Sequence, residues 1–312
     1  MAQKIATREA YGNALAEFGG DPRIVVLDSD LSKSTKTDTF KKVFPERFVN
    51  MGIAEGNMMS VAAGLATTGK VVFASSFAMF AALRACEQVR NSICYPKLNV
   101  KIGASHAGLT VGEDGASHQS VEDIAIMRAI PNMIVINPSD ATTMRAAVKA
   151  AIEIDGPVYL RLGRLPVDVL YEEDVPFQVG KGIQIKEGND VTIIATGMMV
   201  GIALAAVETL TAEGVHARLI DMHTIKPIDQ EIILKAAKET GAIVTVEEHN
   251  VLGGLGGAVT EVVADLFPVP VKRVGIQDVF GKSGKPMLLL EKYGLTSATI
   301  VKAAKSAIAM KK

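Results

Sequence analysis

Short apolar runs alternate with helical segments over the first half of the chain. Each apolar run is bounded by turn residues, which is typical of a buried β-strand. We expect strands near residues 23–28, 48–51, 70–76, 97–103, 132–140 and 156–164. Helices are expected between them, the clearest at residues 8–18, with Thr7 as its cap, and at residues 141–154. This alternation predicts a parallel sheet with helices on both faces.

The alternation stops in residues 166–190, which contain two prolines, an acidic cluster and a short alternating run at 177–186. We expect a linker with a hairpin there. The pattern then resumes, with strands expected at 191–195, 217–220 and 242–246 and helices at 199–213 and 229–240. The sequence therefore predicts two α/β domains of ordinary size, residues 1–165 and 191–312, joined by the linker 166–190.

One carboxylate lies in an otherwise apolar stretch, residues 48–65. The stretch is expected to turn at Gly52 into a helix of small and apolar residues, with Glu55 at the turn. A helix that is apolar on every face is buried, and an ionised carboxylate is costly there. Glu55 either complements the helix dipole, as acids in a first turn often do, or it is paired, protonated or chemically employed.

Polar residues also gather where other strands of the first domain end. Residues 28–34 follow one strand, and a long loop at 104–119 with two histidines, two acids and three glycines follows another. Ligands bind at the carboxyl ends of strands in open parallel sheets, and long polar loops are usually functional. Phe77 and Phe80 are three positions apart, so they are expected to share a helix face near this edge of the sheet. Their rings either form a platform for a flat ligand or pack in the core.

Composition narrows the class of protein. The 33 basic and 34 acidic residues nearly balance, which gives no electrostatic case for nucleic acid or an anionic membrane. Cys86 and Cys94 form no metal or disulfide pattern. The N-terminus lacks the apolar core of a signal peptide, and no apolar run approaches the roughly 20 residues of a membrane span. We expect a soluble cytoplasmic protein.

The glycine-rich segment 250–259 is a weak candidate for nucleotide binding. It lacks the position in a first βαβ unit and the later acid that a dinucleotide fingerprint requires, so close helix packing is the favoured interpretation. The preceding Glu247, Glu248 and His249 include one histidine and are expected to form a local polar network rather than a metal site.

Three motifs, in order, resemble the pyrimidine-binding domain of transketolase: residues 52–58, 76–80 and 112–119. Residues 225–229 and 247–257 resemble the smaller C-terminal domain of the same enzymes. The resemblance covers nearly the whole chain, and the Gly-Glu-Asp-Gly-Ala-Ser-His-Gln loop is its most specific part. It implies two α/β domains and thiamine diphosphate as cofactor.

The resemblance also implies roles for cofactor-binding residues. Glu55 matches the catalytic acid that hydrogen-bonds the aminopyrimidine ring and favours its imino tautomer. Phe80 matches the ring that stacks on the pyrimidine, and Phe77 is its neighbour. Asp30 matches an acid near the thiazolium edge. Leu83 stands where transketolases often have a third aromatic residue.

The resemblance assigns further residues to the substrate. His118 and Asp114 match residues that bind sugar hydroxyls near the reacting carbons, and His118 is also expected to act in catalysis. The terminal phosphate of a sugar phosphate is expected to be held by Arg8, Ser34, His106 and Arg164. Two arginines and a histidine suit a dianion through charge-assisted hydrogen bonds.

The diphosphate-binding half of transketolase has no match in this sequence. That half carries a Gly-Asp-Gly motif and a following Asn for magnesium, and the pyrimidine-like domain here begins almost at Met1. The resemblance therefore implies the C-terminal subunit of a split transketolase. It would contribute no metal ligand itself, share thiamine diphosphate with an N-terminal subunit that holds Mg²⁺, and form a heterotetramer.

The expected reaction transfers a two-carbon ketol unit from a ketose phosphate to an aldose phosphate. The alternatives are a split transketolase for an unusual pentose or sulfosugar, a deoxyxylulose-phosphate synthase, the beta subunit of a 2-oxo acid dehydrogenase, and a non-catalytic scaffold subunit. The 112–119 loop favours transketolase over the synthase and the dehydrogenase. The presence of both the acid and the loop argues against a scaffold.

Overall fold

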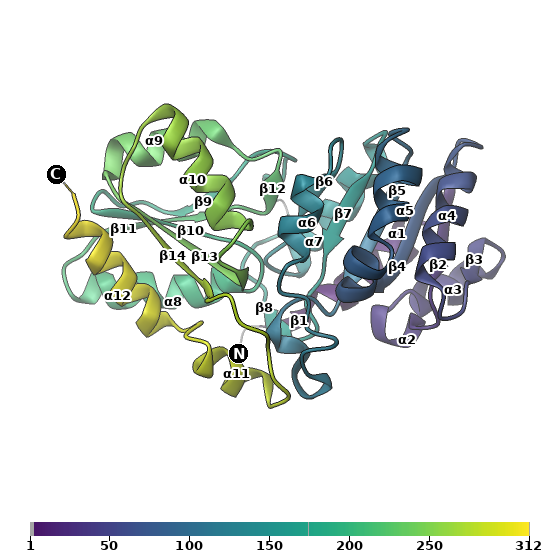
Figure 1. The fold of residues 1–312 in the computed structure, drawn as a ribbon, viewed down its shortest axis with the longest axis horizontal. Coiled ribbons are helices and arrows are strands. Elements are labelled where there is room, and N and C mark those ends of the chain that lie inside the picture. Colours follow the sequence, from purple (N-terminus) through teal and green to yellow (C-terminus); the bar gives the residue numbers. More distant parts are fainter. Residues whose placement is uncertain (1–2, 174, 312) are drawn as a thin grey trace.

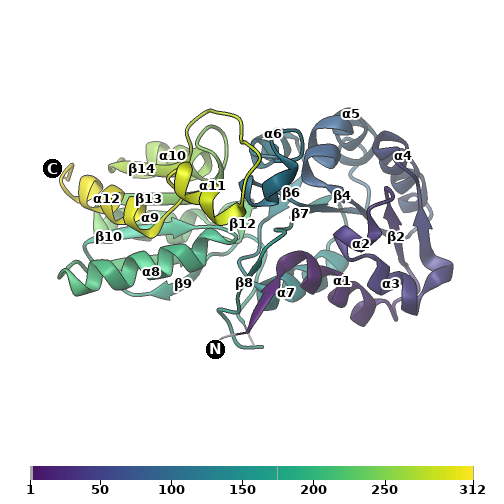
Figure 2. The same ribbon diagram turned by 90° about the horizontal axis from the view of Figure 1, so that it is seen from below.

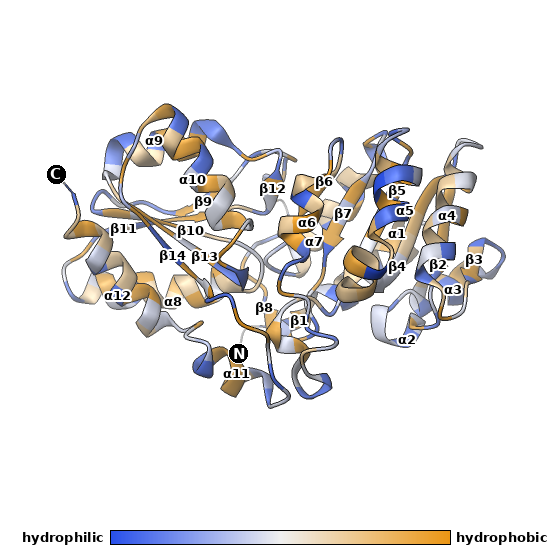
Figure 3. Ribbon diagram, in the orientation of Figure 1, coloured by the Kyte–Doolittle hydropathy of each residue, from blue (hydrophilic) through white to orange (hydrophobic). Residues whose placement is uncertain are grey.

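The computed structural model describes residues 3–173 and 175–311 and contains two α/β domains, as the sequence predicted (Figure 1). The first is built on a seven-stranded sheet and the second on a five-stranded sheet. Apolar residues run along the central strands of both sheets, and hydrophilic residues gather on loops and outer helix faces (Figure 3). The alternation of apolar runs and helices thus arises from strands buried on both faces.

The larger sheet has the strand order β12-β6-β7-β5-β4-β2-β3. All neighbours pair in parallel except β12 and β6, which are antiparallel. Its strands are β2 (Ile24–Asp28), β3 (Phe48–Asn50), β4 (Val71–Phe77), β5 (Val100–Ser105), β6 (Ile134–Ile136), β7 (Val158–Arg161) and β12 (Thr224–Lys226). The parallel strands end at one edge, where the predicted site residues lie.

Helices cover both faces of this sheet (Figure 2). On one face lie α1 (Thr7–Phe18), α3 (Asp38–Val43) and α7 (Ala141–Glu153), which share a buried cluster with the sheet. On the other lie α4 (Glu55–Ala66), α5 (Cys86–Gln88), α6 (Asp123–Ala129) and the π-helical turns η2 (Phe80–Arg84) and η3 (Val89–Cys94). Shorter elements are α2 (Ser32–Thr35), η1 (Pro45–Arg47) and η4 (Leu109–Asp114).

The smaller sheet has the order β14-β13-β10-β11-β9, parallel except for the edge strand β9. Its strands are β9 (Ile183–Lys186), β10 (Val191–Ala195), β11 (Ala217–Asp221), β13 (Ile243–Asn250) and β14 (Val271–Ile276). Its helices are α8 (Met199–Ala212), α9 (Gln230–Thr240), α10 (Leu255–Leu266), α11 (Pro286–Lys292) and α12 (Ser297–Ile308). Helices α9 and α10 lie on one face and α8 and α12 on the other (Figures 1 and 2).

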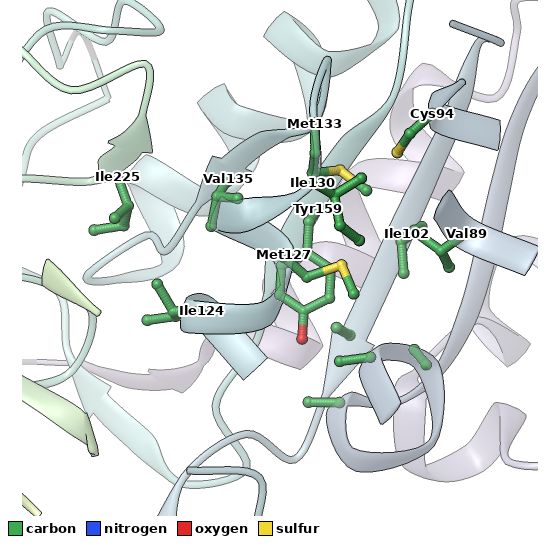
Figure 4. Close-up of a cluster of buried hydrophobic side chains, with 14 of the residues drawn as sticks. Val89, Cys94, Ile102, Ile124, Met127, Ile130, Met133, Val135, Tyr159 and Ile225 are labelled. Atoms are coloured by element: carbon green, nitrogen blue, oxygen red, sulfur yellow. The ribbon is translucent and has the colours of Figure 1, made fainter. Parts of the chain in front are cut away.

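The two domains share a sheet strand and a hydrophobic core. β12 follows β11 in the chain, yet it pairs with β6 of the first domain. Ile225 on β12 belongs to the same buried cluster as Ile124 and Val135 of the first domain (Figure 4). Buried apolar surface is the main source of stability, so the domains form one packed unit.

Two local expectations were wrong. The run at 177–186 forms no hairpin, because β9 pairs with β11 as an antiparallel edge strand. β8 (Pro166–Asp168) pairs instead with β1 (Lys4–Ala6). Thr7, expected as the cap of the first helix, is the first residue of α1, and its hydroxyl accepts the Gly163 N–H at 2.8 Å. Within residues 3–173 and 175–311, no helix is both long enough and apolar enough to span a membrane.

Candidate active site

Glu55 is buried at the first position of α4. The turn before it uses Gly52, whose φ is 68°, and the Gly52 N–H is bonded to the Asn50 side chain at 3.0 Å. Only 2% of the Glu55 residue surface is exposed. Its Oε2 accepts a hydrogen bond from Arg84 Nη1 at 2.9 Å, and its Oε1 lies 3.5 Å from Ser76 Oγ. The prediction of a buried acid at this turn is confirmed.

Four rings form a layer beside this acid. Phe77, the last residue of β4, stacks on His106 with ring centroids 3.9 Å apart. Phe80, the first residue of η2, lies nearly parallel to Phe77 at 5.9 Å. His118 approaches Phe80 edge-on at 5.4 Å. The two phenylalanines therefore meet as predicted, although Phe77 lies at the end of a strand rather than on a helix face.

His106 is buried and neutral. Only 3% of its surface is exposed, its φ is 58°, and its Nδ1 is 2.8 Å from Ser105 Oγ. Burial, reinforced by the positive charges of Arg8 and Arg164, lowers the pKa of the imidazole from 6.5 to about 3. The uncharged imidazole of His106 therefore forms hydrogen bonds without a charge near neutral pH. The positive charge expected around the phosphate comes from the two arginines.

Arg8, Ser34, Asp114 and Arg164 form a second group. Arg8 Nη1 donates to the Ser34 carbonyl at 2.8 Å, and its Nε donates to the Arg164 carbonyl at 3.3 Å. Arg164 donates to the Val111 carbonyl, and its Nη1 lies 3.7 Å from Asp114 Oδ2. Burial and the neighbouring Arg164 lower the pKa of Arg8. The fold thus brings two guanidinium groups together beside His106.

Asp30 lies on the loop that follows β2. It is exposed, has a φ of 65°, and accepts a hydrogen bond from Asn50 Nδ2 at 2.8 Å. The buried acid at the end of β2 is Asp28, which accepts bonds from the Leu31 N–H and the hydroxyls of Thr35 and Thr37. Asp28 fixes the loop that carries Asp30 and Ser34, a role that sequence reasoning missed.

The loop with His106 and His118 is held by the second domain. Glu248 on β13 accepts the Thr110 N–H at 2.7 Å, and Gln119 Nε2 donates to the Lys282 carbonyl at 3.0 Å. Arg161 Nη2 also donates to the Glu248 carbonyl at 3.0 Å while its guanidinium pairs with buried Asp123. These contacts fix a long polar loop that would otherwise be mobile.

The glycine-rich segment packs at a helix terminus. Glu247 accepts the N–H groups of Leu255 and Gly256 at 2.7 and 2.8 Å. A helix N-terminus favours an anion, and here a carboxylate of the chain itself fills that position. Glu247 and Glu248 therefore form local polar contacts, as expected. Among residues 3–173 and 175–311, no cluster of three His, Cys, Asp or Glu side chains is arranged to hold a metal ion.

Arg84 is the second residue that sequence reasoning missed. Its Cζ lies 4.2 Å from the centroid of the Phe80 ring, and the same guanidinium donates to Glu55. The available signal was its spacing of four residues from Phe80, which places both side chains on one helix face. A buried acid beside an aromatic layer, with two arginines nearby, can bind a flat nitrogen heterocycle together with an oxygenated anion.

Comparison with known proteins identifies the family. Residues 3–168 match the transketolase pyrimidine binding domain, and residues 180–300 match the transketolase C-terminal domain. The chain belongs to the transketolase family. Thiamine diphosphate is the cofactor that the pyrimidine binding domain implies. In this transketolase section, the Glu55 and Phe80 side chains lie within the matched pyrimidine binding domain.

Three relatives cover nearly all of this transketolase section. A chain from Methanocaldococcus jannaschii assigned to the transketolase C-terminal section is 54% identical over 299 residues, 95% of this chain and 94% of that one. A 6-deoxy-6-sulfo-D-fructose transketolase subunit from a Clostridium species is 45% identical over 298 residues, 95% and 92%. A split gene transketolase solved as an inactive beta4 tetramer is 58% identical, with a TM-score of 0.93 and coverage of 99% and 100%.

Proposed function

We propose that this chain is the C-terminal subunit of a two-chain transketolase that transfers a ketol unit from a ketose phosphate to an aldose phosphate. The observation that carries the proposal is the buried Glu55 carboxylate, which Arg84 joins to the Phe80 ring and its neighbour Phe77. The relatives described as a C-terminal section and as a split gene product support a separate chain. We place the assembly in the cytoplasm.

The residues at this site fit the pyrimidine end of thiamine diphosphate. The guanidinium of Arg84 is itself a flat nitrogen group, and it lies on Phe80 while donating to Glu55. A flat ring with a nitrogen at its edge would contact the same face of Phe80 and the same carboxylate of Glu55. The side chains that would hold the ring are therefore Phe80, by stacking, and Glu55, by a hydrogen bond to the ring nitrogen.

When bound, thiamine diphosphate supplies the nucleophilic carbon and the electron sink of ketol transfer. The chain's own part is to hold a proton and exclude water. Glu55 Oε2 would share a proton with the pyrimidine edge, and the apolar residues of α4 keep the Glu55 side chain away from solvent. Removing water strengthens the hydrogen bond on which the ring's tautomer depends.

A second group of side chains is proposed to bind the substrate. Arg8 and Arg164 bind the terminal phosphate through charge-assisted hydrogen bonds, aided by neutral His106 and the segment around Ser34. His118 and Asp114, both on the loop that follows β5, orient sugar hydroxyls near the reacting carbons, and His118 moves a proton there. Asp30 is proposed to act at the thiazolium edge.

The diphosphate and its Mg²⁺ are proposed to bind a separate N-terminal subunit. A cofactor held at its two ends by two chains stabilises their association, because each chain then binds the other and the cofactor together. We propose a heterotetramer containing two copies of each chain. No nucleic acid or membrane takes part.

A second candidate substrate is a sulfosugar. The relative that is 45% identical is a subunit of a 6-deoxy-6-sulfo-D-fructose transketolase. A sulfonate carries one negative charge and three oxygens, so the Arg8 and Arg164 guanidinium groups suit it as well. Comparing turnover of a ketose phosphate with that of a matching sulfonate separates the two candidates.

The experiment that tests the proposal is reconstitution with the N-terminal subunit. We expect ketol transfer that needs both chains, thiamine diphosphate and Mg²⁺. Glu55→Ala should abolish turnover while leaving the circular dichroism spectrum and assembly unchanged. The matched control is Glu208→Gln, because Glu208 is an exposed acid on α8. Near-normal turnover by Glu55→Ala would remove the assignment, and inactivity of the wild-type mixture would favour a scaffold.

A further inference from the structure

Arg84 joins the two residues proposed to contact the pyrimidine. Its Nη1 donates to Glu55 Oε2 at 2.9 Å, and its Cζ lies 4.2 Å from the Phe80 ring centroid. The side chain is 51% exposed, whereas that of Glu55 is 2% exposed. The arginine therefore reaches from solvent across the ring to a buried acid.

A guanidinium resembles the edge of an aminopyrimidine in the features that this site recognises. Both groups are flat, both stack on an aromatic face, and both place nitrogen atoms in the plane where a carboxyl group bonds them. Phe77 and His118 also contact the Phe80 ring, at 5.9 and 5.4 Å. The face under Arg84 is therefore the part of this ring that a ligand would use.

We propose that Arg84 holds the pyrimidine position of the cofactor-free subunit and moves out when the ring binds. The inference rests on the proposed function, since it takes Glu55 and Phe80 as the ring's contacts. Two flat groups cannot stack on the same face of Phe80 while both bond the same carboxylate oxygen. Arg84 and the cofactor thus compete for one place.

The contacts of Arg84 with Glu55 and Phe80 are weak enough for a bound cofactor to replace them. One hydrogen bond to Glu55 and one cation–π contact hold a half-exposed side chain, and pairs of this kind are of modest strength. Arg84 also ends the π-helical turn η2, a type of turn found often at functional sites. If the pair is formed in about nine subunits of ten, the apparent affinity for the ring is reduced about tenfold.

The pair also protects the empty site. An unpaired carboxylate buried in an apolar pocket is costly, and Arg84 neutralises it until the cofactor arrives. Arg84 therefore stabilises the free subunit while weakening its affinity for the ring. Removing the Arg84 side chain should therefore lower the stability of the free subunit and raise its affinity for the ring, and these two changes can be measured separately.

The test measures thiamine diphosphate binding by titration calorimetry, with Mg²⁺, to the complex of this chain with the N-terminal subunit. Arg84→Ala should bind about tenfold more tightly than wild type and unfold at a lower temperature. The matched control is Arg90→Ala, because Arg90 is an exposed arginine on η3 whose Nη1 donates to its neighbour Asn91 at 2.6 Å. Its affinity should equal that of wild type.

A competition measurement gives a second readout. Millimolar guanidinium chloride should weaken thiamine diphosphate binding to Arg84→Ala, because the ion refills the vacated place, more than sodium chloride at equal ionic strength does. Wild type should show no such difference between the two salts. Arg84→Lys, which keeps the charge and loses the flat group, should lie between wild type and Arg84→Ala.

Weaker or unchanged binding by Arg84→Ala would overturn the proposal. Weaker binding would mean that Arg84 contacts the bound cofactor, and unchanged binding would mean that it never competes. Either result leaves the proposed function standing if wild type binds the cofactor. Failure of the wild-type complex to bind thiamine diphosphate would instead remove the proposed function and this inference with it.

Discussion

The Glu248 carboxylate accepts the Thr110 N–H at 2.7 Å and so connects the second domain to the loop that carries His106 and His118. Burial raises the pKa of Glu248 from 4.5 to about 7, although Arg161 and the Thr110 bond act in the opposite direction. A residue far from the reacting groups in the sequence therefore supports the candidate site and responds to pH.

Glu248→Gln should change how stability depends on pH. The folded protein holds the Glu248 proton more tightly than the unfolded chain, so its contribution is fully present below pH 4.5 and is lost as the pH rises through about 7. Glutamine keeps an oxygen for Thr110 and cannot ionise. Urea unfolding should give the variant a free energy of unfolding about 2 kcal/mol above wild type at alkaline pH, with little difference in acid. An equal difference at all pH values would contradict this.

His106 should remain neutral across the physiological range. Burial and the charges of Arg8 and Arg164 lower its pKa to about 3. We expect its ring-proton NMR signals to stay constant between about pH 5 and 8. Arg8→Gln should raise the pKa, because one positive charge is removed. A titration of His106 near pH 6.5, the ordinary value, would contradict the burial argument.

Phe80→Leu should weaken cofactor binding in the reconstituted enzyme. Leucine fills much of the space but cannot stack on a flat ring, which loses about 1 kcal/mol, or about fivefold in the dissociation constant for thiamine diphosphate. Calorimetric titration measures the change. Phe267→Leu, at the exposed end of α10, is the control and should bind as wild type does. Equal affinities for both variants would remove Phe80 from the pyrimidine site.

Arg8→Gln should raise the KM for a phosphorylated donor. A charge-assisted hydrogen bond contributes about 1.5–3 kcal/mol, so we expect an increase of about 10- to 100-fold with little change in kcat. Arg8→Lys should be intermediate, because it keeps the charge and loses the planar group. Steady-state kinetics with the unphosphorylated ketose is the control. The same loss for both donors would show that Arg8 acts on folding rather than on phosphate.

Much of the fold could be predicted from the sequence because its strands are buried on both faces. The strand predicted at 191–195 has those bounds, and the helix predicted at 8–18 begins one residue earlier. β12 could not be predicted, because three residues carry little pattern and their partner β6 lies about 90 positions earlier in the chain. Pairing at that distance depends on tertiary packing.

The site could be predicted where a charged side chain occurs among apolar residues. Glu55 drew attention as an acid in an apolar helix, and it is buried. Asp28 ends β2 and Asp30 follows it, and the pattern could not tell which is exposed, since the outcome depends on the hydroxyls of Thr35 and Thr37. Arg84 was missed, because its contacts depend on a helical turn whose type the spacing does not reveal.

Strand β12 comes from the second domain and pairs with the sheet of the first, which limits where the polypeptide can be divided. A protease cut between residues 168 and 180 would leave both pieces bound to each other, because β12 stays paired with β6 and Ile225 stays in the common core. Separating the pieces would expose the bare edge of β6, which invites pairing with foreign strands. Expressed alone, the pyrimidine domain should therefore aggregate, so gene fission at this junction is disfavoured.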